Sequence, residues 1–403
     1  MSGRTPDEGK YPARLMMTAD AVGGIWTYAL ELATALGQSG VTTLLATMGP
    51  APSPAQYRAA ARVAGLELVH QPYRLEWMPE CEADLGQAGA WLLDLAGRFR
   101  PDIVQINGYA AAALPWQRPV VVVCHSCVRS WWRAVHGREA PLEWHAYGRR
   151  VAQGLAAADV VIAPSRAFLA TMQTLYGPLP AAAVIHNSRS PGIFRPAARK
   201  ESLILAAGRL WDQAKNIAMV ERVAPRLPWP VCVAGPARIA EVDDGAARGE
   251  CSAATGNIRC LGVLDERAMA EWLGRAAIFV LPARYEPFGL AVLEAAMSGC
   301  ALVLGDIAPL RELWHGAALF VDPNDADGLE TALRRLIDDG AMRSALGAAA
   351  AARARQFSVT DMTEKYRAVY LRARGAHGHA RHLRLLRDTH AAMAMATGRG
   401  FGR

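Results

Sequence analysis

The sequence predicts an α/β protein built from two doubly wound domains, each a parallel sheet with helices on both faces. The first observation is size, since 403 residues with 52% hydrophobic content are enough for two full cores. The second is that short apolar runs alternate with segments of helical periodicity along the chain, which is typical of parallel sheets. The third is a polar break at 188–199, containing two prolines and one glycine, which divides this series in two.

The first series predicts a domain over residues 1–190. It begins with an apolar run at 13–19, followed by a turn that contains Gly23 and Gly24 and by a helical segment. Further strands are expected at 41–46, 66–70, 102–106, 120–124, 160–163 and 183–185.

The second series predicts a domain over residues 200–358. Its strands are expected at 203–207, 231–234, 258–261, 278–281, 301–304 and 318–321, and helices at 327–339, 341–355 and 359–370 follow them. Because doubly wound sheets bind ligands outside the carboxyl ends of their strands, we expect the site in the cleft between the domains.

A strand, a loop and a helix around residues 284–299 predict a ligand site in the second domain. The expected helix begins at Phe288, so the backbone N–H groups of Phe288, Gly289 and Leu290 are free to bind phosphate. Glu286 precedes this helix and Glu294 lies inside it, roughly 9 Å from Phe288 at about 1.5 Å per residue. Two carboxylates flanking a phosphate site suit a nucleotide sugar. The alternative is an ordinary helix start with an acidic residue that complements the dipole.

The stretch from Glu286 to Leu290, followed by Glu294, resembles the E-x7-E signature of the retaining GT-B glycosyltransferases of family 4. The resemblance covers residues 13–372. It implies two Rossmann-like domains facing across a cleft, with a helix at about 359–372 crossing back onto the first domain. It also implies retaining, metal-independent transfer of a sugar from a nucleoside diphosphate donor to an unidentified acceptor (a glycan, a lipid-linked acceptor or a small molecule), without a cofactor.

The resemblance assigns roles to the charged residues of the second domain. Glu286 would hold hydroxyls of the transferred sugar, and Glu294 the ribose of the nucleotide. Arg209 and Lys215, which follow the strand at 203–207, would stabilise the departing diphosphate. Their spacing is six residues instead of the family's usual five, and the alternative is a solvated loop with two cations.

On the first domain the resemblance points to His125, Gly23 and Gly24. His125 follows the strand at 120–124, where the family places a histidine that faces the transferred sugar; a structural histidine is the alternative. Gly23 and Gly24 match a glycine loop whose backbone approaches donor or acceptor, with an ordinary tight turn as the alternative.

An aromatic and basic segment after His125, with Trp131, Trp132 and Arg133, is the candidate acceptor platform, because indoles stack on sugar rings and arginines bind anions. A packed helical hairpin with a charged outer face explains it equally well. One departure from the family lies at 186–190, where His-Asn-Ser-Arg-Ser replaces the common N-G-V-D. A sugar-nucleotide epimerase or a non-catalytic binding relative stays an alternative function.

No metal site is expected. The triplet at 325–327 has the D-x-D form, but it precedes an amphipathic helix, where Asp325 is a preferred cap. Cys124 and Cys127 form a C-x-x-C without a second ligand pair or a thioredoxin-like context. Seven cysteines in a long chain also argue against a disulfide framework and for a reducing compartment.

The net charge of +7 lies almost entirely in the predicted tail, 373–403 and the residues just before it, so a nucleic-acid-binding face is not expected. No apolar run reaches the ~18 residues of a membrane span, and no signal-peptide core is visible. These features predict a cytoplasmic protein. The tail is expected to be disordered and solvated, with peripheral binding to anionic lipid at the inner face of the membrane as the alternative.

Overall fold

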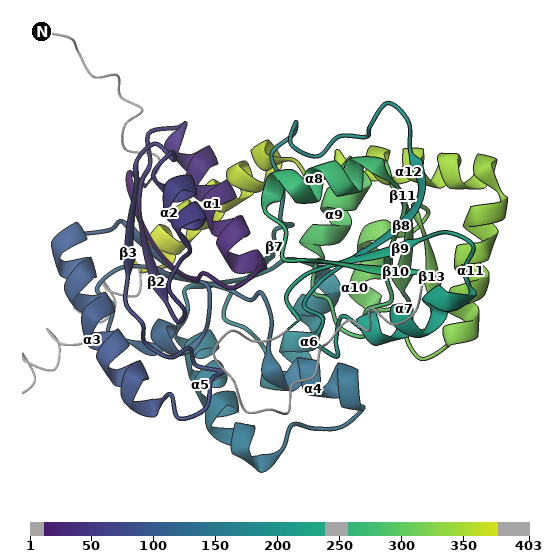
Figure 1. The fold of residues 1–403 in the computed structure, drawn as a ribbon. Helices are drawn as coiled ribbons and strands as arrows, with labels where there is room; N and C mark the ends of the chain where they lie inside the picture. Colours follow the sequence, from purple (N-terminus) through teal and green to yellow (C-terminus); the bar gives the residue numbers. More distant parts are fainter. Residues whose placement is uncertain (1–11, 238–256, 378–403) are drawn as a thin grey trace, which may run out of the picture.

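The computed structural model describes residues 12–237 and 257–377, which form two α/β domains joined at 188–200 (Figure 1). The first domain contains a parallel seven-stranded sheet in the order β3-β2-β1-β4-β5-β6-β7. Its strands are β1 Arg14–Asp20, β2 Thr42–Met48, β3 Leu66–His70, β4 Ile103–Ile106, β5 Val120–Val123, β6 Val160–Ala163 and β7 Ala182–Val184. The helices that cover it are α1 Gly24–Gly37, α2 Pro54–Ala60, α3 Glu82–Phe99, α4 Val128–His136, α5 His145–Ala157 and α6 Arg166–Tyr176, with short 3-10 turns η1 Ala110–Ala113 and η2 Leu142–Trp144.

The second domain contains a parallel six-stranded sheet in the order β10-β9-β8-β11-β12-β13. Its strands are β8 Glu201–Ala207, β9 Val231–Ala234, β10 Ile258–Gly262, β11 Ala276–Leu281, β12 Ala301–Gly305 and β13 Ala318–Val321. Its helices are α7 Ile217–Val223, η3 Ala224–Arg226, α8 Glu266–Arg275, α9 Leu290–Met297, α10 Ala308–Trp314, α11 Ala326–Asp338 and α12 Gly340–Ala354. The predicted fold class is therefore confirmed.

Every strand predicted from an apolar run is present, with bounds that differ by at most two residues. The runs are readable because the central strands of each sheet are buried on both faces, so strands such as β5, β6, β9 and β11 are apolar at every position. In β5, for example, Val121 and Val123 pack on one face of the sheet with α1 and the last helix, while Val120 and Val122 pack on the other. Each sheet therefore has a hydrophobic core on both of its faces, and a layer of helices covers each core.

The last helix, residues 359–377, crosses from the second domain back to the first (the yellow helix in Figure 1). Phe357 still belongs to the core of the second domain, whereas Met362, Tyr366 and Tyr370 belong to the first-domain core beside α1 and β1. The helix extends past the predicted limit at residue 372, and the rest of the predicted tail, 378–403, lies outside the described residues. Within the described chain, no helix combines the length and the hydropathy that a membrane crossing requires.

The linker has no regular secondary structure over 188–199, as predicted, but part of it is buried. Ser188 is 1% exposed and Arg189 is 5% exposed. The linker therefore begins inside the protein, and its polar sequence did not predict this burial.

Candidate active site

The predicted phosphate-binding turn follows β11, but its helix begins later than the sequence suggested. Gly289 has φ 90 and is the N-cap residue of α9, so the first helical residue is Leu290 and not Phe288. A left-handed φ at Gly289 interrupts the helical path, which is a conformation that glycine adopts readily. The distance of roughly 9 Å, which assumed helix from Phe288 onward, therefore does not apply. Among the described residues, no hydrogen-bond acceptor is assigned to the N–H groups of Phe288, Gly289 or Leu290.

Lys215 and Glu286 meet at this turn. The ammonium of Lys215 lies 2.5 Å from Glu286 Oε2, and the two side chains are 19% and 12% exposed. Lys215 reaches this position although its spacing from Arg209 is unusual. Its backbone N–H bonds to the carbonyl of Asp212, and Asn216 after it adopts φ 56, so the loop folds back toward β11.

Arg209 is held by an aspartate that the sequence analysis did not single out. Its Nη2 lies 2.6 Å from Asp212 Oδ2, and Asp212 also accepts a 3.1 Å hydrogen bond from Nε1 of Trp131 in the first domain. Burial opposes the charge on Asp212, but Arg209 and Lys215 outweigh it and lower the pKa of the carboxyl. Asp212 thus fixes one cation and joins the two domains.

Glu294 lies in a separate ionic group and does not meet Glu286. Its carboxylate is 14% exposed, and Oε1 lies 2.9 Å from Nε of Arg189 in the linker. Burial raises the pKa of Glu294 to about 7, although Arg189 lowers it. Arg189 belongs to the segment that departs from the family pattern, and this departure was the one sequence signal for it.

The glycine loop of the first domain packs against these second-domain residues. A Cβ at Gly23 would lie 3.8 Å from Nη1 of Arg209, and a Cβ at Gly24 would lie 3.3 Å from Cδ1 of Leu290. Asp20, at the end of β1, also faces Arg209. Burial raises the pKa of Asp20 to about 6, although the hydrogen bond from the Val22 N–H and the charge of Arg209 both lower it. The structure therefore brings the predicted loop, Arg209 and the start of α9 together.

His125 lies at the carboxyl end of β5 as predicted, and its tautomer follows from its neighbour. Asn107 donates through Nδ2 to the carbonyl of Thr18 at 2.7 Å, which leaves Asn107 Oδ1 as an acceptor. Nε2 of His125 lies 3.2 Å from that oxygen, so Nε2 carries the proton and Nδ1 keeps its lone pair. Burial lowers the pKa of His125 to about 3, so the ring is neutral at physiological pH.

A buried polar network connects His125 to the last helix. Gln105 donates to Asn107 Oδ1 at 3.2 Å and to the hydroxyl of Tyr28 at 3.0 Å, while Tyr370 donates to Gln105 Oε1 at 2.6 Å. Tyr28 also packs edge-on against His125, with ring centroids 4.5 Å apart. The crossing helix thus supports the shell around His125, which no local sequence pattern indicated.

The loop that carries Glu286 is held by the first domain at two points. The hydroxyl of Tyr285 accepts a 3.0 Å hydrogen bond from the N–H of Cys127 and lies 2.8 Å from Oγ of Ser130. Oγ of Ser165 donates to the carbonyl of Pro287 at 2.8 Å. Glu286 is therefore fixed between residues that both bond to the other domain.

The three residues predicted as an acceptor platform have different surroundings. Trp131 faces the second domain through Asp212, as described above. Trp132 packs against His136 with ring centroids 4.3 Å apart, and Arg133 pairs with Glu139 at 2.5 Å. The structure therefore brings only Trp131 to the charged residues of the cleft.

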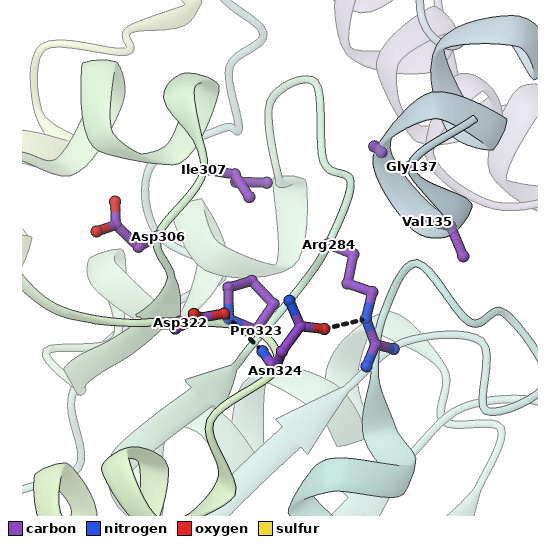
Figure 2. A pocket seen from close by; sticks show the side chains of 9 residues that line it. Val135, Gly137, Arg284, Asp306, Ile307, Asp322, Pro323 and Asn324 are labelled. Atoms are coloured by element: carbon purple, nitrogen blue, oxygen red, sulfur yellow. Dashed lines mark hydrogen bonds between the residues drawn. The ribbon is translucent and has the colours of Figure 1, made fainter. Parts of the chain in front are cut away.

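A groove of about 500 Å³ lies between the end of α4 and the second sheet (Figure 2). Arg284, two residues before Glu286, extends into it and donates to Asn324 Oδ1 at 3.4 Å. Its lining comprises Ala134, Val135, Gly137, Arg284, Asp306, Ile307, Asp322, Pro323 and Asn324. The groove is polar, borders both domains and adjoins the loop that carries Glu286.

The residues set aside as metal candidates have structural contacts. Asp325 caps α11 by accepting from the N–H of Gly328 at 2.9 Å, as the sequence suggested. Cys124 and Cys127 are buried free thiols, and Sγ of Cys127 lies 3.1 Å from the hydroxyl of Tyr176. Across 12–237 and 257–377, no three His, Cys, Asp or Glu side chains gather as metal ligands do.

Two family models match the chain, one in each domain. The model described as Glycosyltransferase Family 4 matches residues 22–190, and the model described as Glycosyl transferases group 1 matches residues 201–339.

Curated relatives include proteins named as mannosyltransferases, glycosyltransferases and synthases. The O-antigen chain mannosyltransferase B of Escherichia coli is 34% identical over 108 residues, which are 27% of this chain and 28% of that protein. The glycogen synthase of Mycobacterium tuberculosis is 42% identical over 85 residues, 21% of this chain and 20% of that protein. The chain thus spans less than a third of these two relatives. The D-inositol 3-phosphate glycosyltransferase of Kineococcus radiotolerans is 26% identical over an alignment of 412 positions, which covers 88% of this chain and 92% of that protein.

Solved structures share the two-domain fold at low identity. Sucrose-phosphate synthase from Thermosynechococcus elongatus superposes with a TM-score of 0.74 at 17% identity, covering 89% of this chain and 98% of that chain. Anabaena HepE in complex with UDP-glucose superposes with a TM-score of 0.69 at 17% identity, covering 87% and 97%.

Proposed function

The chain belongs to the GT-B glycosyltransferases of family 4, and on this premise we propose that it transfers a sugar from a nucleoside diphosphate sugar to an acceptor hydroxyl with retention of configuration. The observation that carries the proposal is the contact between Lys215 and Glu286 at the turn before α9. A cation for phosphate and a carboxylate for sugar hydroxyls meet there beside free backbone N–H groups, so a donor that contains both chemical groups fits.

The proposed roles follow from the charges. Arg209, Lys215 and the N–H groups of residues 288–290 stabilise the diphosphate as the bond between it and the anomeric carbon breaks. Glu286 holds hydroxyls of the transferred sugar, and Glu294 the ribose. The acceptor oxygen bonds to the anomeric carbon on the face that the diphosphate leaves, and its proton passes to the departing phosphate oxygen. Since fixed cations and dipoles stabilise the leaving group, the reaction does not require a metal ion.

We infer that the acceptor binds along α4. The groove between the end of α4 and the second sheet adjoins the Glu286 loop, and its carboxylates, amide and guanidinium suit the hydroxyls of a carbohydrate acceptor. Replacing Val135 with Trp fills part of this groove, and we expect a higher KM for the acceptor with an unchanged KM for the donor. Leu142→Trp is the control, because Leu142 is 79% exposed and does not line the groove.

A panel of nucleotide sugars tests the function. Each is incubated with the protein, with and without candidate acceptors and with and without EDTA, and the free nucleoside diphosphate is measured. Transfer predicts diphosphate release that depends on acceptor and survives EDTA, and NMR of the product identifies the anomer. Conversion of the donor sugar without diphosphate release indicates the epimerase, and binding without either reaction indicates a non-catalytic relative.

A further inference from the structure

Arg189 makes contacts that its place in the linker does not predict. Its Nη1 donates to Glu31 Oε1 of α1 at 2.7 Å, its Nη2 donates to Glu266 of α8, and its Nε lies 2.9 Å from Oε1 of Glu294 in α9. The Arg189 side chain is 4% exposed, and its guanidinium carbon lies over the ring of Phe194, 5.0 Å from the centroid. One buried cation from the linker therefore joins a helix of the first domain to two helices of the second.

The three carboxylates depend on Arg189 to different degrees. Glu31 also accepts from the N–H and Oγ of Ser190, at 3.1 and 2.5 Å. The Glu266 side chain is 52% exposed, so water solvates it. Glu294 is 14% exposed, and no other donor in the described chain is assigned to its carboxylate. An ionised carboxylate in such a place needs a counter-charge, so Glu294 depends most on Arg189.

The guanidinium that faces Glu294 is itself held in place. Its Nη1 donates to Glu31 and its Nη2 donates to Glu266, and its Nε lies 2.9 Å from Oε1 of Glu294. Glu31 and Glu266 thus fix the guanidinium beside the Glu294 carboxylate.

We propose that Arg189 is a positioning residue for the donor nucleotide, which keeps the Glu294 carboxylate ionised and oriented to accept hydrogen bonds from the ribose. This inference rests on the proposed role of Glu294. Without the guanidinium, the buried carboxyl takes up a proton more readily, with Glu31 and Glu266 as the other charged groups facing it. Nucleotide affinity then decreases when Glu294 takes up a proton, and Arg189 determines the pH at which this happens.

Calorimetric titration of UDP and of GDP between pH 6 and pH 9 tests the proposal. In the wild type, affinity decreases as the pH falls through the pKa of Glu294, about 7. In Arg189→Gln, we expect affinity about tenfold weaker at pH 7, the loss expected for a charge-assisted contact, and the midpoint of the decrease at higher pH. The nucleotide phosphate also titrates in this range, but it does so equally with every variant, so it does not affect the difference in midpoint between variant and wild type.

Two variants separate this role from a structural one. In a Glu294→Gln background, Arg189→Gln should change affinity by less than about twofold, since the two residues act as a unit. Glu31→Gln keeps the Glu294 contact but removes a negative charge that faces Glu294, so it should move the midpoint to lower pH, opposite to the shift in Arg189→Gln. If Arg189→Gln does not fold, Arg189→Lys carries the test, with a smaller shift in the same direction.

The outcomes distinguish the two proposals. Unchanged nucleotide affinity in Glu294→Gln overturns the role of Glu294 and this inference with it. If Glu294→Gln weakens binding but the Arg189 variant loses affinity equally at every pH, or loses none, only the role of Arg189 is overturned.

Discussion

The two sides of the cleft differ in the kind of polar group that they present. The second domain contributes charged groups, with Arg209, Lys215 and Glu286 gathered around the start of α9. Apart from Asp20, which faces Arg209, the first domain contributes a neutral network around His125 and Asn107. In a transfer reaction, negative charge develops on the leaving diphosphate, so fixed charges act most strongly on that side. The neutral side can position hydroxyl groups without attracting phosphate to the wrong surface.

The largest effect tests the charged side. Replacing Glu286 with Ala removes the proposed sugar contact and leaves Lys215 without its partner, while the ribose site at Glu294 is untouched. We expect kcat to fall about 10²- to 10³-fold, the usual loss for a preorganised electrostatic contact, with nucleotide affinity largely kept. Steady-state kinetics and calorimetry measure the two quantities, with Glu271→Ala on exposed α8 as control. A wild-type kcat would place the sugar elsewhere.

A smaller effect is expected where the two sides meet. Trp131→Phe keeps the aromatic packing but removes the N–H donor to Asp212, and a hydrogen bond to a charged group contributes about 1.5–3 kcal/mol. We expect the KM for the donor to rise about tenfold, because Arg209 loses part of its orientation. Trp132→Phe is the matched control, since Trp132 packs against His136 within its own helix. Equal kinetics in both variants would show that the cross-domain hydrogen bond does not position Arg209.

The neutral side can be tested through pH. Because the pKa of His125 is lowered to about 3, its ring does not change charge between pH 5 and pH 8. The unfolded chain takes up this proton near pH 6.5, so the contribution of neutral His125 to stability is complete above that value and decreases below it. Denaturant unfolding at pH 7.5 and pH 5 should show a smaller acid loss for His125→Asn than for the wild type. An equal loss would mean that the ring is protonated in the folded protein.

The smallest effect concerns the basic tail. Residues 371–403 contain seven arginines and one acidic residue. The expectation is a solvated extension; under the alternative of a peripheral anchor, about 1 kcal/mol for each basic residue near an anionic surface gives reversible membrane binding that salt removes. Cosedimentation with anionic and neutral vesicles compares the full chain with a version ending at residue 377, where the described helix ends. If both versions bind alike, the tail is not an anchor.

The sequence was most informative where neighbouring residues determine the structure. The strands were predicted to within two residues, since the central ones are apolar runs buried on both faces. The start of α9 was wrong by two residues, because a glycine inside a helical pattern does not reveal its φ. The sequence spacing predicted that Arg209 and Lys215 lie on one loop near the cleft. It did not predict that Asp212, which lies between them, pairs with Arg209.

The contacts that join distant segments were not predictable in this way. Tyr28 and Tyr366 form a 2.5 Å hydrogen bond across 338 positions of sequence. In the sequence, Arg189 is an ordinary cation of a linker. In the structure, it pairs with Glu31, Glu266 and Glu294. Such contacts are determined by how the two domains pack together. Periodicity in a single sequence indicates helices and strands, but it does not indicate how domains pack.

The crossing of the last helix makes the second domain an insertion within the first. The core of the first domain needs Tyr366 and Tyr370, which follow the whole of the second domain in the chain. During synthesis the second domain can therefore complete its core before the first one can. We expect nascent chains released near residue 357 to contain a folded second domain beside a first domain whose surface around α1 and β1 is still uncovered, and this surface is where a chaperone would bind them.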